Sequence, residues 1–273
     1  MNRGVFRDSA DWVINRYHLT GPKVVTVIGT VILLLLTLFF VNVAANIASF
    51  WAPVKAYSHP LQDLVCEFFN VTAYTTAYNN TVDSLLIPFC AVTAVVIVLN
   101  PLAIFIALKL MIAIIISYLL RVSTLLVTSL PDSWNMGTRT VEDTYAHFGR
   151  DRGGDLIFSG HTMLIVLFAH AWSSFYLITD SYALHWITGL LAWAYTIMVL
   201  IFITVARLHY TIDVLLALYI ASGVWWSLSY FQTRFFEEPV SKMKFRRTPV
   251  PPLNSRSADE VEQQPDLSVQ PAQ

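Results

Sequence analysis

The sequence predicts an all-α fold, a polytopic membrane protein with six transmembrane helices, and three observations support this. Apolar residues make up 56% of the 273 residues. Charged residues make up 13%, about half of the roughly 25% that soluble domains carry. Apolar runs long enough for spans of about 20 residues recur along the chain. We therefore expect one six-helix transmembrane domain over residues 24–231.

Each span follows from one of these runs. The first is expected over about residues 24–50, an apolar segment too long for a cleaved signal peptide. Residues 84–130 are long enough for the second and third spans, with a turn between Asn100 and Lys109. The last three spans are expected at about residues 156–178, 183–206 and 212–231.

The basic residues predict how the spans are oriented. They gather in residues 1–23 and in the tail, residues 232–273, and cytosolic segments of membrane proteins are enriched in Lys and Arg. Both ends are therefore predicted to be cytosolic, with the loops at residues 51–83 and 131–155 exoplasmic. The tail is proline-rich and lacks apolar periodicity, which is typical of disorder. The net charge of −1 gives no indication of nucleic-acid binding.

Two polar clusters interrupt the apolar pattern. The first is Gly-Gly-Asp-Leu-Ile-Phe-Ser-Gly-His-Thr, residues 153–162, where the fourth span begins. The second is Ala-Arg-Leu-His-Tyr-Thr-Ile-Asp-Val, residues 206–214, between the fifth and sixth spans. The predicted topology brings both to the exoplasmic border of the membrane. Ionisable residues at such a border are functional candidates by default.

The first cluster has the features of a phosphate site. Ser159 before a helix is a natural N-cap, and Gly160 lets the backbone approach a ligand closely. A helix N-terminus offers free N–H groups to an anion such as phosphate. His161 would project from that first turn, so a histidine is expected beside the bound anion.

The second cluster supplies a second histidine with a carboxylate and a cation. His209 and Asp213 are four residues apart and would share one face of a helix. A carboxylate beside an imidazole fixes its tautomer and stabilises its protonated form. Arg207 adds a fork-shaped cation suited to phosphate oxygens. A metal site is not expected, because no His-x-x-x-His or cysteine pattern accompanies these residues.

Other histidines and the cysteines have less specific interpretations. Cys66 and Cys90 are too few for a disulfide framework. A lone histidine at a membrane border is usually an interface anchor. We expect a non-catalytic role for the remaining histidines: His18, His59, His147, His170 and His185.

At this level of detail the sequence resembles a known family. Within residues 154–162 and 209–214, Ser-Gly-His and His-x-x-x-Asp are similar to the second and third signatures of the lipid phosphate phosphatase superfamily. Their fuller forms resemble the sphingomyelin synthase branch more closely. Residues 59–63 resemble its Pro-Leu-x-Asp motif, and residues 121–131 resemble its motif at the end of the third span. The resemblance covers about residues 51–226.

Two features depart from these patterns. Gly153 stands where the branch usually has cysteine, and the basic first signature of the phosphatases is absent. A dianionic phosphomonoester would require more positive charge than remains, so the absence disfavours a phosphomonoesterase.

The resemblance implies a phospholipid:ceramide head-group phosphotransferase. His209 would attack the phosphorus of a membrane phospholipid while Asp213 holds its ring, and His161 would protonate the departing diacylglycerol oxygen. Ceramide would then take the head group from the phosphohistidine. No metal or cofactor is implied. The resemblance also implies a Golgi or plasma membrane location with an exoplasmic active site.

Substrate-binding roles are expected for residues in or beside the four motifs: Arg207, Ser159, Gly160, Asp155, Arg121 and Asp63. Arg121 has a second interpretation, in which it snorkels to the interface. A choline head group would favour an aromatic cage, for which the exoplasmic loops offer Trp51, Tyr57, Trp134, Tyr145 and Phe148. Ethanolamine and inositol remain open.

Two alternatives compete with transfer. A lipid phosphatase or phospholipase C-type hydrolase would use the same histidines with water as the acceptor, and the residues alone do not separate it from a transferase. A channel or transporter would spread ionisable residues through the membrane interior. Here they concentrate at one border, which disfavours that class.

Overall fold

In a computed structural model of the chain, the described residues are 17, 20–51, 61–69, 76–131 and 156–235. Their regular structure is entirely helical, as predicted, and no strand occurs among them. The helices are α2 (Gly21–Phe50), α3 (Leu64–Phe68), α4 (Thr76–Leu99), α5 (Ala103–Val127), α7 (Gly160–Ser174), α8 (Tyr182–Val205) and α9 (Thr211–Phe235).

Five of these helices are long and apolar enough to cross a membrane, namely α2, α4, α5, α8 and α9. They correspond to the first, second, third, fifth and sixth predicted spans, so the chain is a polytopic membrane protein. The fourth predicted span differs. Its helix, α7, has 15 residues and is about 22 Å long at 1.5 Å per residue, against about 30 Å for the hydrocarbon core. Six full spans are therefore not confirmed.

The shortness of α7 follows from how it starts and ends. Ser159 caps it, so helix begins four residues later than predicted, and the backbone becomes extended at Phe175. The amide of Asn100, in the turn between α4 and α5, donates to the carbonyls of Tyr176 and Leu177, at 3.0 and 3.2 Å. Non-helical backbone at membrane depth is tolerated where protein supplies such partners.

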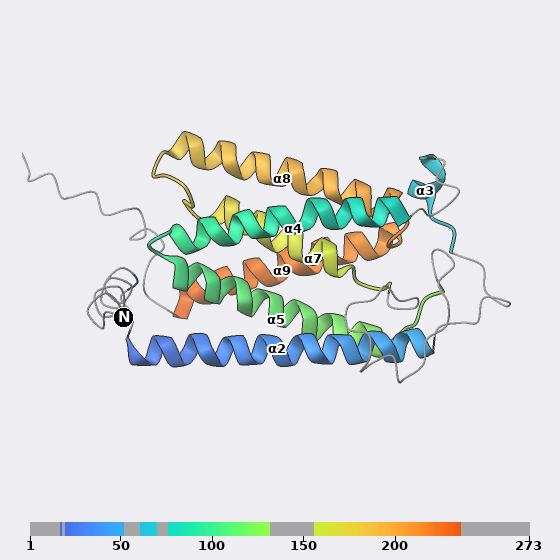
Figure 1. Cartoon of the computed structure of the whole chain (residues 1–273), viewed down its shortest axis with the longest axis horizontal. Helices are drawn as coiled ribbons and strands as arrows, with labels where there is room; N and C mark the ends of the chain where they lie inside the picture. Colours follow the sequence, from blue (N-terminus) through green and yellow to red (C-terminus); the bar gives the residue numbers. More distant parts are fainter. Residues whose placement is uncertain (1–16, 18–19, 52–60, 70–75, 132–155, 236–273) are drawn as a thin grey trace, which may run out of the picture.

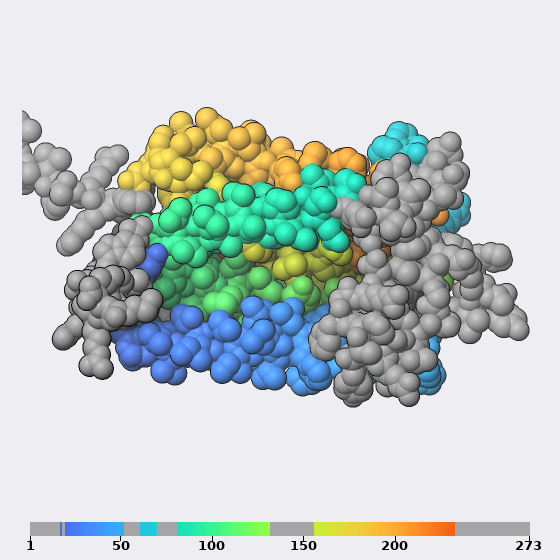
Figure 2. All heavy atoms as spheres, viewed as in Figure 1, coloured from blue at the N-terminus to red at the C-terminus, as the bar shows by residue number. Residues whose placement is uncertain are grey.

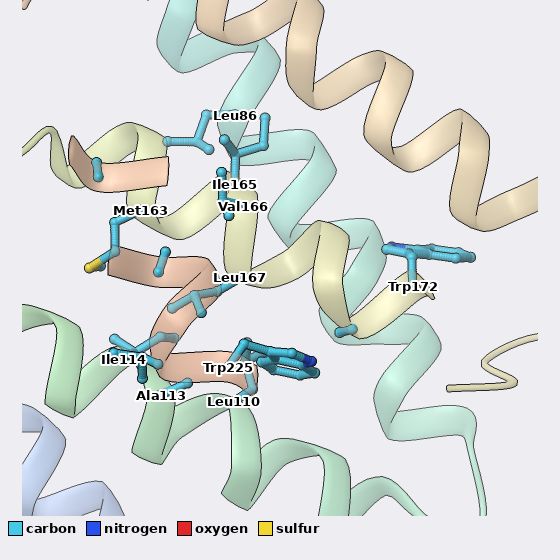
Figure 3. Packing of buried hydrophobic residues seen from close by; sticks show 14 of the residues in the cluster. Leu86, Leu110, Ala113, Ile114, Met163, Ile165, Val166, Leu167, Trp172 and Trp225 are labelled. Atoms are coloured by element: carbon cyan, nitrogen blue, oxygen red, sulfur yellow. The ribbon is translucent and has the colours of Figure 1, made fainter. Parts of the chain in front are cut away.

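Helix α7 forms the centre of the bundle. It packs against α8, α9, α5 and α4, and the close-up shows side chains of α4, α5 and α9 packed around it (Figure 3). Several of its side chains have no exposed surface, namely Met163, Ile165, Val166, Leu167, Ala169 and Ala171. Apolar side chains lie on most sides of α7 because it faces protein on most sides.

Helix α2 lies on the outside, along α5 (Figures 1 and 2). The face that it turns to the bundle is built from small residues, with Ala44, Ala45 and Ala48 at most 3% exposed. Small residues let membrane helices approach closely. Its long apolar side chains point outward, as expected of a helix surrounded by lipid.

The chain reverses between α4 and α5 at Asn100–Leu102, at the start of the interval predicted for this turn. Lys109 lies inside α5 and is buried. The ends of α2, α5 and α8 and the beginnings of α4, α7 and α9 all lie at one end of the bundle, with α3 beside them (Figure 1). Both predicted polar clusters therefore reach the same end.

Candidate active site

His161 and His209 meet at this end of the bundle. His161 is the second residue of α7, and His209 lies in the connection between α8 and α9. Their ring centroids are 6.3 Å apart, with 61° between the ring planes. An attacking atom lies about 3–3.5 Å from its target in a reactive complex, so one phosphorus atom between the rings would be within reach of both.

The turn at the end of α8 directs the second cluster, residues 206–214, toward the site. The N–H of Arg207 donates to the carbonyl of Thr204 at 2.9 Å, and that of Leu208 donates to Ile203 at 3.2 Å. This is the Schellman pattern, in which the residue after the C-cap is left-handed and usually glycine. Here Arg207 occupies it with φ of 53°. A left-handed arginine is strained, and such strain concentrates at functional sites.

His209 is held as a neutral base. Its Nδ1 lies 2.8 Å from the carbonyl oxygen of Leu156, and a carbonyl only accepts. Nδ1 therefore carries the hydrogen, and Nε2 has the free lone pair. Burial, and then the positive charges of His161 and Arg121, lower the pKa of His209 to about 3 against the opposing effect of the Leu156 bond. At neutral pH the ring is thus uncharged, with its lone pair on Nε2.

Asp213 does not hold this ring as the sequence predicted. His209 precedes α9, which begins at Thr211, so the two residues do not share a helical face. The Asp213 carboxylate instead accepts from the N–H of Tyr210 at 3.0 Å, the reciprocal bond of a capping box. Its carbonyl accepts from the N–H of Ser159 at 3.4 Å. Asp213 therefore joins the starts of α7 and α9, and the Leu156 carbonyl orients His209.

The start of α7 has the N-cap that the sequence predicted, and its surroundings explain why residue 160 is a glycine. Ser159 is the N-cap, and its hydroxyl accepts from the N–H of Thr162 at 3.3 Å. A Cβ on Gly160 would occupy the space of the Arg121 guanidinium. Arg121 of α5 therefore points into the site, where its charge acts on His209 and Asp213. Snorkelling to the interface does not describe it.

The Asp63 carboxylate accepts hydrogen bonds from the starts of two helices. Its Oδ1 accepts from the N–H groups of Val65 and Cys66 at 3.0 and 3.4 Å, which caps α3. Both carboxylate oxygens also bind Thr211, with Oδ2 at 2.6 Å from its N–H and Oδ1 at 2.8 Å from its hydroxyl. Burial alone would raise the pKa of Asp63, but these bonds hold it below its usual value. The carboxylate thus ties α3 to the first residue of α9.

The other predicted site residues are Arg207, Asp155 and the residues of the aromatic cage. The guanidinium of Arg207 is close enough to Cys66 to lower the pKa of that thiol, although burial and the Asp63 charge raise it overall. Asp155 lies outside the described residues. So do the predicted cage residues Tyr57, Trp134, Tyr145 and Phe148, whereas Trp51 is exposed at the end of α2.

Asp83 is a site residue that was not predicted from the sequence. It lies in α4, and its Oδ1 is 3.2 Å from Nε2 of His161, with 47% of the Asp83 side chain and 36% of the His161 side chain exposed. The second span was predicted to start one residue later, which left Asp83 in a loop. An acidic residue at the edge of a long apolar run was the available signal.

Apart from the two clusters predicted from the sequence, another group of polar side chains lies within the bundle, around Lys109 and His170. Nζ of Lys109 is 2.8 Å from the Ser229 hydroxyl and 4.5 Å from the centre of the Trp225 ring. His170 lies 2.9 Å from the Ser222 hydroxyl and stacks on Trp225. Polar side chains with such partners hold membrane helices together. A structural role fits the expectation for His170.

No group of three or more His, Cys, Asp and Glu residues in the described part of the chain is placed to hold a metal ion. The described part of the candidate site brings together two histidines, the Arg121 cation and the start of α7. These groups can carry out nucleophilic attack, proton transfer and anion binding.

The family model described as PAP2 superfamily C-terminal matches residues 153–230. The matched segment is less than half of the chain and holds both histidines, whereas Asp63, Asp83 and Arg121 precede it. The match supports the lipid phosphate phosphatase superfamily and, at this coarse level, phosphoryl-transfer chemistry on lipid phosphate esters. No curated protein matches the chain.

Proposed function

We propose that the protein is a phospholipid:ceramide head-group phosphotransferase of the sphingomyelin synthase type. It moves a phospho-head group from a glycerophospholipid to ceramide through a phosphohistidine and releases diacylglycerol. The observation that carries the proposal is the His161–His209 pair, with ring centroids 6.3 Å apart at the start of α7. The family match over residues 153–230 supports the same chemistry.

In the first half reaction, Nε2 of His209 attacks the phosphorus of the donor lipid. The phosphorus–oxygen bond to the glycerol breaks, and the oxygen takes a proton from His161 to leave as diacylglycerol. The head group stays on His209 as a phosphohistidine. Arg121 and the N–H groups at the start of α7 stabilise the phosphoryl oxygens.

In the second half reaction, the primary hydroxyl of ceramide enters. His161, neutral after the first step, takes the hydroxyl proton, and the ceramide oxygen attacks the phosphorus. The phosphorus–nitrogen bond breaks and His209 regains its lone pair. Both histidines return to their starting state, so the cycle balances without a cofactor.

The different environments of the two histidines support this division of roles. His209 is 7% exposed, and its pKa of about 3 keeps it unprotonated at neutral pH. His161 is more exposed and lies beside a carboxylate. Groups whose environments separate their protonation states are typical of acid and nucleophile pairs.

A hydrolase is the second candidate. The partial exposure of His161 would allow water to take the place of ceramide as the acceptor. This lipid phosphatase or phospholipase C-type reaction uses the same first half reaction. It differs only in what attacks the phosphohistidine.

The deciding experiment uses the purified chain in detergent with phosphatidylcholine, phosphatidylethanolamine or phosphatidylinositol labelled in the head group. We expect label on ceramide, with release of diacylglycerol, only when ceramide is present. Equal release of water-soluble labelled head group with and without ceramide would identify a hydrolase. The donor that yields label names the head group.

A further inference from the structure

We propose that Asp83 of α4 is a positioning residue that holds His161 through Nε2, so that the other ring nitrogen exchanges the proton with the lipid oxygen. This inference rests on the proposed function, because it assigns a partner to the general acid of that reaction. It adds a helix outside the matched segment to the catalytic arrangement.

The contact fixes which nitrogen can serve. Oδ1 of Asp83 lies 3.2 Å from Nε2 of His161. A carboxylate only accepts hydrogen bonds, so Nε2 carries a hydrogen in both the neutral and the protonated ring. The nitrogen that gains and loses a proton during turnover is therefore Nδ1. Asp83 acts here as a carboxylate does in a catalytic triad, by fixing the tautomer and stabilising the imidazolium.

The position of Asp83 is unusual for an acidic residue. Across the five candidate spans, the acidic residues are Asp83 and Asp213, and both lie at the end of the bundle that holds the histidines. Charged residues within spans are costly and functional by default. Asp213 has backbone partners at two helix starts. Asp83 lies within α4, away from its ends, and its partner is His161.

The charges around His161 show why it needs a counter-charge. Arg121 from α5 lies against Gly160, the preceding residue. His209 approaches from the connection between α8 and α9, and Asp83 approaches from α4. Arg121 repels a proton on His161 and neutral His209 offers no negative charge, so Asp83 is the carboxylate among these neighbours that favours the imidazolium. The first half reaction requires that protonated state.

The test compares Asp83→Asn, which keeps the side-chain shape, with Glu67→Gln, which removes an exposed acid of α3 at the same end of the molecule. We expect kcat of Asp83→Asn to fall about 10–100-fold, a part of the 10²–10⁴-fold that general acids contribute. KM for the donor lipid should be unchanged, and Asp83→Glu should recover part of the rate. Glu67→Gln should match the wild type.

Two further readouts separate positioning from structure. The first replaces diacylglycerol by 4-nitrophenolate, a leaving group that needs no proton. Formation of phospho-enzyme from that donor should proceed in Asp83→Asn at the wild-type rate. The second is the pH profile with the natural donor. Because Asp83 contacts His161 directly, its replacement should change the shape of that profile, whereas Glu67→Gln should leave the profile unchanged.

The possible results point to different conclusions. Equal losses with both leaving groups, or a lower unfolding temperature that accounts for the loss, would make Asp83 a structural residue and overturn the inference. Wild-type kinetics in Asp83→Asn would overturn it as well. If the wild type forms no phospho-enzyme from any donor, the proposed function itself fails, whereas an active wild type leaves the comparison with Asp83→Asn to decide.

Discussion

The two histidines of the site show how environment divides the work of one residue type. The same imidazole is desolvated at His209, where the Leu156 carbonyl accepts from Nδ1, and partly exposed at His161, where Asp83 lies against Nε2. Because each ring has one nitrogen occupied by the protein, each has one nitrogen left for the lipid. The chemistry proposed for the site depends on this asymmetry.

The asymmetry predicts different defects for the two alanine variants. His209→Ala should form no covalent phospho-enzyme, because no nucleophile remains. His161→Ala should form it slowly, with a loss of about 10²–10⁴-fold. A donor labelled in the head-group phosphate, quenched in alkali where phosphohistidine persists, measures both. Label retained by His209→Ala would show that the nucleophile is another residue.

Gly160→Ala tests the approach of Arg121 to the start of α7. The added Cβ would displace the guanidinium, which is the end of a flexible side chain and can move. We therefore expect an unchanged unfolding temperature, since alanine is the better helix former. We expect a fall in kcat of about 10²-fold, similar to the loss of one oxyanion donor. A fully active Gly160→Ala would contradict the catalytic role of Arg121.

Burial of His209 predicts how stability changes with pH. Its pKa falls from 6.5 to about 3 on folding, so the unfolded chain binds the extra proton between these values. The stabilisation from this site is complete above about pH 6.5 and is lost as the pH falls toward 3. One pKa unit corresponds to about 1.4 kcal/mol, so lowering the pH from 6.5 to 5 should remove about 2 kcal/mol.

This pH effect is measured as the unfolding temperature in detergent at the two pH values. His209→Asn is the matched control, because its amide can still donate to the Leu156 carbonyl but does not titrate. The wild type should lose more stability than this variant. Equal losses in both proteins would show that His209 does not account for the acid sensitivity.

At the scale of single elements, local rules predicted some features and missed others. The Ser159 cap was predictable, because an N-cap needs only the serine hydroxyl and the backbone N–H three residues later. The left-handed end of α8 was not, because arginine stands where the rule expects glycine. The spacing of His209 and Asp213 was misleading for a related reason. The prediction assumed that both residues lie in one helix, whereas α9 begins only at Thr211.

Contacts between distant segments account for the other differences. Asp63 and Thr211 are far apart in the sequence, yet the carboxylate of one caps the helix of the other. Asp83 meets His161 in the same way. Periodicity and spacing describe one element at a time, so they identify the histidines and leave their supporting partners undetermined.

The Asp63 contacts predict a loss of stability that spreads to the site. Asp63→Ala removes the acceptor of the Thr211 N–H and the cap of α3. Loss of a helix N-cap costs about 0.5–2 kcal/mol, and we expect a loss of that size in the free energy of unfolding. Activity should fall as well, because Thr211 follows His209 closely. Glu67→Ala, in α3 but outside these contacts, is the control, and an equal loss there would contradict the assignment.

At the scale of the whole molecule, the bundle separates its functional parts. The starts of α4, α7 and α9 lie at one end with the histidines, and the beginning of α2 and the end of α9 lie at the other (Figure 1). Exposed apolar side chains lie along α2, which forms an edge of the molecule in Figure 2, while α7 is enclosed. The short α7 therefore places His161 through packing against protein, without having to match the bilayer itself.

This arrangement predicts that the tail lies on the membrane side opposite the histidines. Because basic residues flank the helix ends that lie away from the site, those ends should be cytosolic and the site exoplasmic. In sealed vesicles with the cytosolic face outward, added protease should remove the chain after α9. A cysteine introduced at Thr211 should react with an impermeant maleimide only after the membrane is opened. Cleavage of the tail that also requires opening would show that the orientation is reversed.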